Sequence, residues 1–180
     1  IIGNTVKSIG NNTFYGCSSL PSIEIPKNVT SIGNYAFDNC SKLSNVIIED
    51  RDIVLTLGSN DSSPIFSDCP LDSVYIGGDI SYKTTSSYGY SPFYNNKTLR
   101  AVTITDKETE ISENEFYGCA NLKSVSIGDG VETIGKYAFS GCSSLESFAF
   151  GTSMKTIGEE AFSDCTALVK LHSKAMTPPV

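Results

Sequence analysis

The sequence repeats itself with a fixed period. The ten residues Ser31–Cys40, SIGNYAFDNC, return with small changes at Ser8–Cys17, Thr133–Cys142 and Thr156–Cys165. Phe14 and Phe37 are 23 residues apart, and so are Phe116 and Phe139. A second phrase, Leu-x-x-Ile-x-Ile or a close variant, follows in seven copies that begin at Leu20, Leu43, Leu71, Leu99, Leu122, Leu145 and Leu168. A period of this size over nearly the whole chain predicts a solenoid.

Each repeat contains two kinds of local pattern. The last two apolar residues of Leu-x-x-Ile-x-Ile alternate, which predicts a short strand with one buried face. The spacing in Ile-Gly-x-x-Ala-Phe-x-x-Cys favours a helical or 3₁₀ turn, with the glycine allowing a sharp turn. One unit cannot bury its own apolar face, so successive units must stack. We therefore expect a mainly β or α/β solenoid of about seven repeats around one parallel sheet.

The period breaks in the middle of the chain. Repeats are regular over 1–48 and 108–173 and irregular over 49–107, where Phe37 to Phe66 spans 29 residues. Within this region Ile53–Leu57 alternates apolar residues and could form an added strand, which Ile80 and Tyr82 could pair with. We treat 1–180 as a single repeat domain. Because the chain begins in mid-repeat and no polar cap is evident, we expect it to be a fragment of a longer protein.

All six cysteines occupy the same repeat position. Side chains stacked in register would place their Cβ atoms about 4.8 Å apart or further, whereas a disulfide needs about 3.8 Å. No CxxC-like cluster suggests zinc. The pattern predicts a column of small, buried, reduced thiols.

Composition and motifs argue against several classes of function. The net charge is -7 with a pI near 4.6, which disfavours nucleic acid and anionic membrane surfaces as partners. The sequence has no 18-residue apolar run for membrane insertion in this segment, no phosphate loop and no GxGxxG motif after a strand. The single histidine, His172, lies in the least regular copy, and nothing places a nucleophile beside it. We expect no catalytic residue, no metal and no cofactor.

Candidate contact residues lie on the exposed side of the strands and in the irregular region. The outward column of the sheet reads Glu24, Ile47, Tyr75, Thr103, Ser126, Ala149 and His172, with one apolar spot at Ile47 and Tyr75. Tyrosine among serine and glycine offers a large contact area with few torsions to freeze. The candidate partner-binding residues are Ile47, Tyr75, Tyr82, Tyr88, Tyr90 and Tyr94. The alternative is that the tyrosine-rich insertion packs on its own coil.

The repeat resembles the BspA-like class of leucine-rich repeats, a family of bacterial cell-surface proteins. Leu20–Cys40 matches Leu-x-x-Ile-x-Ile-Pro-x-x-Val-x-x-Ile-Gly-x-x-Ala-Phe-x-x-Cys at every fixed position, and the likeness covers essentially the whole chain. The resemblance implies a right-handed leucine-rich-repeat array with a concave parallel sheet and short turns or 3₁₀ segments on the convex side. It also implies a secreted or surface-anchored bacterial protein, whose signal and anchor lie outside this segment, and it brings no catalytic residues.

Three functions remain open from the sequence. The first is a non-catalytic adhesion module that binds a protein, such as one of the host extracellular matrix, or a cell-surface glycan. The second is a structural spacer that displays another domain of the parent protein. The third is a carbohydrate-active enzyme, which no residue pattern specifically supports.

Overall fold

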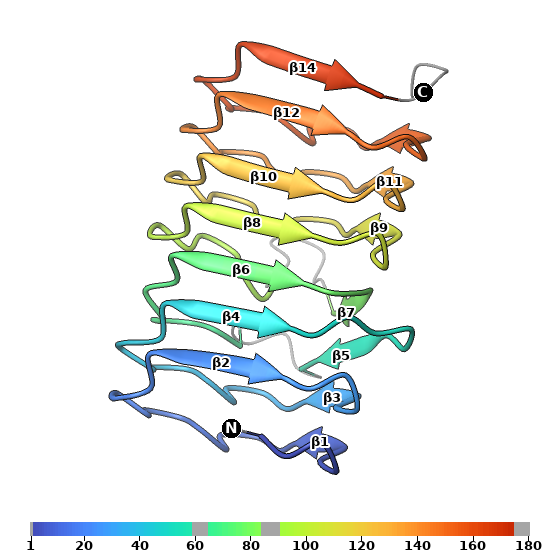
Figure 1. Cartoon of the computed structure of the whole chain (residues 1–180). Coiled ribbons are helices and arrows are strands. Elements are labelled where there is room, and N and C mark those ends of the chain that lie inside the picture. Colours follow the sequence, from blue (N-terminus) through green and yellow to red (C-terminus); the bar gives the residue numbers. More distant parts are fainter. Residues whose placement is uncertain (1, 59–64, 84–90, 175–180) are drawn as a thin grey trace.

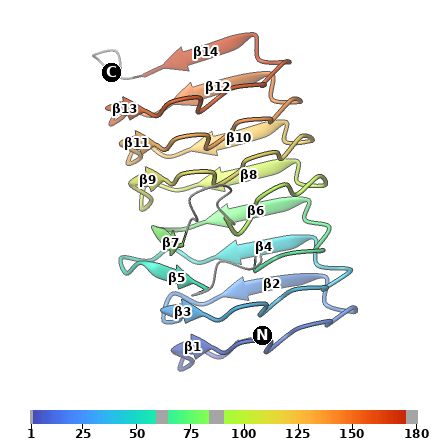
Figure 2. The same ribbon diagram turned by 180° about the vertical axis from the view of Figure 1, so that it is seen from behind.

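Successive repeats form the coils of a parallel β-solenoid, stacked one above another (Figure 1). The structure is a computed structural model and describes residues 2–58, 65–83 and 91–174. Each coil contains a long strand, a short strand and a segment of turns that leads to the next coil (Figure 2). The described residues contain no helix, so of the predicted alternatives the mainly β solenoid is confirmed.

The long strands carry the predicted alternation. The first five form one parallel sheet in the order β10-β8-β6-β4-β2, and β12 and β14 pair with each other. In β4 the side chains of Val46 and Ile48 are buried, while Asn45 and Ile47 are exposed. Equivalent residues of the repeat face each other across the sheet, as Ile47 does Tyr75. The bounds are β2 Ser22–Ile25, β4 Asn45–Ile48, β6 Ser73–Ile76, β8 Ala101–Ile104, β10 Ser124–Ile127, β12 Ser147–Phe150 and β14 Lys170–Ser173.

The short strands form a second parallel ladder beside the long ones. They are β1 Ser8–Ile9, β3 Ser31–Ile32, β5 Leu55–Leu57, β7 Ile80–Tyr82, β9 Glu110–Ile111, β11 Thr133–Ile134 and β13 Thr156–Ile157. The predicted pairing of the 53–57 region with Ile80 and Tyr82 is confirmed. However, β5 also pairs with β3, so it is the short strand of its own coil and not an addition to the repeat. The ladder has two parts, β1-β3-β5-β7 and β9-β11-β13.

The turn segments bring one aromatic ring from each coil into the core. The rings of Phe14, Phe37, Phe66, Phe93, Phe116, Phe139 and Phe162 stack in this order, with neighbouring centroids 5.2 to 5.8 Å apart. The residue two positions after each phenylalanine has a positive φ, such as 59° at Asn39 and 70° at Gly118. Glycine, asparagine and aspartate tolerate this conformation best, and only these three types occur there.

The cysteines form a column beside the rings, as predicted for five of the six. Each buried thiol lies within hydrogen-bond distance of a phenylalanine carbonyl in the preceding coil, such as Cys69 and Phe37 at 3.0 Å. All six are free thiols, and burial raises the pKa of Cys69 to about 12. Cys17 departs from the prediction and is exposed, because in the described part of the chain no earlier turn segment lies against it.

Candidate functional site

The outward face of the long strands is a regular surface that runs along the solenoid. Its side chains point away from the core because the strand alternation buries the residues on either side of them. Most positions of the outward column carry small or polar side chains, namely Glu24, Thr103, Ser126, Ala149 and His172. Ile47 and Tyr75 are the exceptions, and they lie on neighbouring strands. The structure therefore brings these two predicted residues together.

The Ile47–Tyr75 pair is an exposed apolar spot with a fixed aromatic ring. The isoleucine is 42% exposed, which is high for a large apolar side chain. The Tyr75 hydroxyl donates a 2.8 Å hydrogen bond to the Asp50 carboxylate, which follows β4. This bond raises the pKa of Tyr75 above its ordinary value. It also orients the ring, so the tyrosine side chain loses little conformational freedom when a partner covers it.

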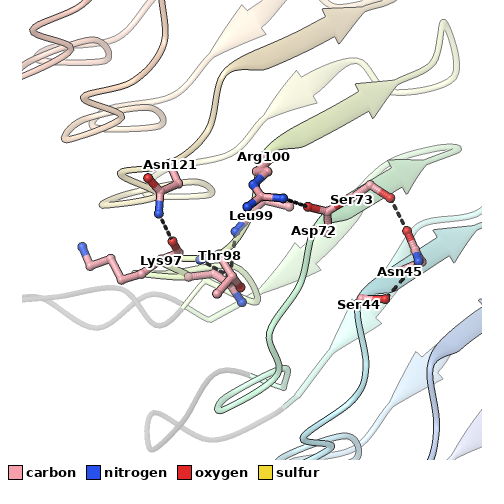
Figure 3. A network of polar contacts seen from close by, with 10 residues as sticks. Ser44, Asn45, Asp72, Ser73, Lys97, Thr98, Leu99, Arg100 and Asn121 are labelled. Atoms are coloured by element: carbon pink, nitrogen blue, oxygen red, sulfur yellow. Dashed lines mark hydrogen bonds and ion pairs between the residues drawn. The ribbon is translucent and has the colours of Figure 1, made fainter.

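A polar rim lies at the N-terminal ends of the strands (Figure 3), and it includes the residues two positions before Ile47 and Tyr75. Ser73 donates to the side-chain oxygen of Asn45 at 2.5 Å, and Arg100 forms a 3.2 Å ion pair with Asp72. These groups are solvent-exposed, so each pair contributes at most about 1 kcal/mol to stability. An apolar centre with a hydrated polar rim is the usual anatomy of a protein-binding surface. The sequence did not single out the rim, because these residues come from three different repeats.

At the opposite ends of the strands, a second polar group lies beyond Asp50. Lys107 forms a 2.6 Å ion pair with Asp52, which raises the pKa of the lysine and lowers that of the aspartate. Both side chains are at least half exposed. The Ile47–Tyr75 pair thus lies between the polar rim and the Lys107–Asp52 pair. Because each includes an ion pair, we call them the two charged borders.

The other candidate tyrosines lie elsewhere. Tyr82 ends β7 and packs against the core, and its hydroxyl donates to the Glu113 carbonyl at 3.0 Å. It therefore has a structural contact that the sequence did not predict. Tyr94 lies in a turn segment, where its ring stacks on Tyr117 with centroids 5.2 Å apart. Tyr88 and Tyr90 lie outside the described residues.

A groove lies between two turn segments next to Tyr94. Its volume is about 590 Å³, and its lining includes Asp68, Asn95, Lys97 and Thr98. The Lys97 ammonium donates to the Gly118 carbonyl at 2.7 Å and is thereby held at one wall. The groove is open, and its lining residues belong to turn segments, whereas Ile47 and Tyr75 belong to the long strands β4 and β6.

No feature of the described residues indicates catalysis or metal binding. Across residues 2–58, 65–83 and 91–174, His, Cys, Asp and Glu side chains form no group of three that could hold a metal ion. His172 lies exposed in β14, opposite Ala149. Within the same residues, no helix has the length and apolar character needed to cross a bilayer.

Comparison with known proteins agrees with the geometry. The family model described as "BspA type Leucine rich repeat region" matches in 6 copies, over residues 1–60 and 86–176. No curated protein matches the sequence.

Two solved structures resemble the fold along most of the chain. One is a leucine-rich repeat protein from Bacteroides ovatus, with 26% identity and a TM-score of 0.62, and 94% of this chain and 47% of that one are covered. The other is a leucine rich cell surface protein from Faecalibacterium prausnitzii, with 28% identity and a TM-score of 0.65, covering 97% of this chain and 44% of that one. The chain therefore spans less than half the length of these two proteins.

Proposed function

We propose that this chain, which belongs to the BspA type leucine-rich repeat family, is a non-catalytic binding module of a bacterial cell surface. The likeness to a leucine rich cell surface protein supports the location. The partner is a protein, with host extracellular-matrix proteins as the first class to test and cell-surface glycans as the second.

The observation that carries this proposal is the Ile47–Tyr75 pair. A large apolar side chain and an oriented aromatic ring lie side by side on a regular, otherwise small or polar sheet face. Aromatic residues at the centre of a patch dominate the energetics of many interfaces, while the surrounding contacts exclude water. The pair provides such a centre, and the two charged borders provide such surroundings.

The dimensions of the sheet face indicate how a partner must bind. A four-residue strand is about 13 Å long, and the seven long strands, spaced about 4.8 Å apart, span about 29 Å. This area of about 380 Å² is well below the roughly 800 Å² that each side of a standard interface buries. A specific partner must therefore also contact the borders, including Arg100 and Lys107. With a net charge of -7, the module favours partners with basic surfaces.

The test is binding of this segment to a panel of matrix proteins and glycans at physiological salt. The variant Ile47→Ala/Tyr75→Ala should weaken a specific partner by about 2 kcal/mol or more, which is about thirtyfold. Tyr15→Ala is the matched control, because Tyr15 is 53% exposed but lies in a turn segment. Binding that both variants retain would move the contact off the sheet face. If the folded segment binds nothing in the panel, the spacer function is favoured instead.

A further inference from the structure

The short-strand ladder is interrupted where β7 and β9 lie in consecutive coils, and we call this place the β7–β9 junction. At a regular junction, two amides of the later coil donate to carbonyls of the earlier one. Glu132 donates to the Thr109 carbonyl at 2.8 Å, and Gly135 donates to the Ile111 carbonyl at 2.7 Å. The long strands β6 and β8 remain paired over four residues at this level. The interruption therefore affects one side of the coil only.

Two carboxylates accept these hydrogen bonds at the β7–β9 junction. The Thr109 amide, which matches that of Glu132, donates to the Asp79 carboxylate at 2.7 Å. The Ser112 amide, which matches that of Gly135, donates to Oε2 of Glu115 at 2.8 Å. At both ends of β9, carboxylates thus accept the hydrogen bonds that backbone carbonyls accept at a regular junction.

The junction also holds acidic side chains inside the core. Glu108 and Glu115 lie one 23-residue period before Val131 and Ala138. Both glutamates therefore occupy positions that are apolar in the next coil. Both glutamates are fully buried. Neither oxygen of Glu108 has a hydrogen-bond partner, and Oε1 of Glu115 has none. A buried ionised carboxylate without a partner is strongly disfavoured, so such a group takes up a proton instead.

The surroundings disfavour ionisation further. Burial raises the pKa of both glutamates well above the ordinary value, and neighbouring carboxylates add to this effect. The charged neighbours are Asp79 before β7 and Glu110 in β9, and Tyr82 in β7 is the other titratable side chain near them. The Ile80 amide faces Glu108 and partly offsets the rise, although it does not reach hydrogen-bond geometry.

Solvent reaches the edge of the junction but not Glu108 or Glu115, which are buried. An open cleft of about 370 Å³ lies at the junction and is lined by Asp79, Tyr82, Thr109, Glu110 and others. We propose that Glu108 and Glu115 make the β7–β9 junction a proton-linked joint: protonated carboxyl groups keep the two coils closed on each other, and their ionisation opens the short-strand side. The paired long strands β6 and β8 hold the two halves of the solenoid together while it opens.

The sign of the pH dependence follows from linkage. In the open state the carboxyl groups are hydrated and ionise near their ordinary pKa of 4.5. In the closed state they remain protonated to higher pH, so the closed state is most favoured below that pKa and loses stability as pH rises. Each carboxyl group then raises the opening constant by about tenfold per pH unit until the closed-state pKa is reached.

Hydrogen exchange measured by mass spectrometry between pH 5 and pH 8 tests the joint. After correction for intrinsic exchange, the opening constant of the 108–116 segment should rise at least tenfold per pH unit. The 131–139 segment, with Val131 and Ala138 at the same repeat positions, should change far less and serves as the internal reference. Glu108→Gln/Glu115→Gln keeps the side-chain size and should abolish the pH dependence, whereas Glu110→Gln, at an exposed site, should preserve it.

Two results would overturn the proposal. One is a pH slope of the 108–116 segment that is the same in the wild type and in the double glutamine variant. The other is an infrared spectrum at pH 7 in which the wild type lacks a protonated-carboxyl band relative to that variant. If the glutamine variant does not fold, Glu108→Val/Glu115→Ala replaces it, since it restores apolar residues of the repeat. Its pH slope must be flat for the proposal to stand.

Discussion

Truncation of one core ring gives a direct measure of what the repeat contributes to stability. Phe139 is fully buried and contacts three other rings. It stacks on Phe116 and Phe162 at 5.3 and 5.4 Å, and Phe148 meets it edge-on at 5.2 Å. Phenylalanine-to-alanine changes in cores cost about 3–5 kcal/mol, and each aromatic pair adds about 0.5–1.5 kcal/mol beyond area burial. We expect Phe139→Ala to fall near the top of the range, at about 4–5 kcal/mol.

Phe14 provides the matched control for this experiment. It belongs to the same column but is only partly buried, and among the described residues it stacks on one ring, that of Phe37, at 5.2 Å. Phe14→Ala should therefore cost about half as much or less. With a urea m-value of about 1–3 kcal/mol/M, a loss of 4 kcal/mol lowers the unfolding midpoint by at least about 1.3 M.

Urea denaturation followed by circular dichroism measures both variants. The m-value must be compared as well as the unfolding midpoint, because long repeat arrays can lose two-state behaviour. A loss below about 1 kcal/mol at Phe139, or equal losses at the two positions, would refute the argument that the ring column is the continuous core.

Three further predictions rest on single contacts. Native protein should react with thiol reagents at Cys17 alone, because the other five thiols are buried and burial raises their pKa values. In denaturant all six cysteines should react. Arg51→Lys should cost about 2 kcal/mol or more in chemical denaturation, since the buried guanidinium donates to four backbone carbonyls, whereas Arg100→Lys at the surface should cost under about 0.5 kcal/mol. Gly135→Ala should lower the melting temperature, because its Cβ would lie 2.6 Å from the Glu113 amide nitrogen, whereas Gly10→Ala meets only a Thr13 side chain at 3.5 Å and should be nearly neutral.

The period alone predicts most of the fold. It predicts which residues of Leu-x-x-Ile-x-Ile are buried, and the parallel register follows because equivalent residues must stack. Sequence reasoning assigned a turn role to the glycines after the short strands, but the structure gives a different reason. At Gly33 and Gly135 a Cβ would collide with the backbone of the preceding coil, a contact between residues more than 20 positions apart. Such close approach depends on the spacing between coils, so it cannot be predicted from the sequence of a single repeat.

The candidate binding site was only partly predictable. The outward column follows from strand alternation, so Ile47 and Tyr75 could be named from the sequence. The polar rim could not, because Asn45, Ser73 and Arg100 acquire their partners only through stacking. Tyr82 is a candidate contact residue by its residue type, and the register places it at the position of Ile32, where it packs against the core. Its role in binding stays a prediction.

The departures from the repeat are more informative when they are mapped on the coils than when they are read along the chain. Tyr82 lies where the other coils have isoleucine or leucine, Ser112 lies where most coils have glycine, and Glu108 and Glu115 lie where most coils have apolar residues. These four positions span more than 30 residues of sequence but gather at one junction, and that is where the short-strand ladder is not formed. Their convergence on one junction argues that the break is a built feature of this solenoid, separate from the sheet face that we propose for binding.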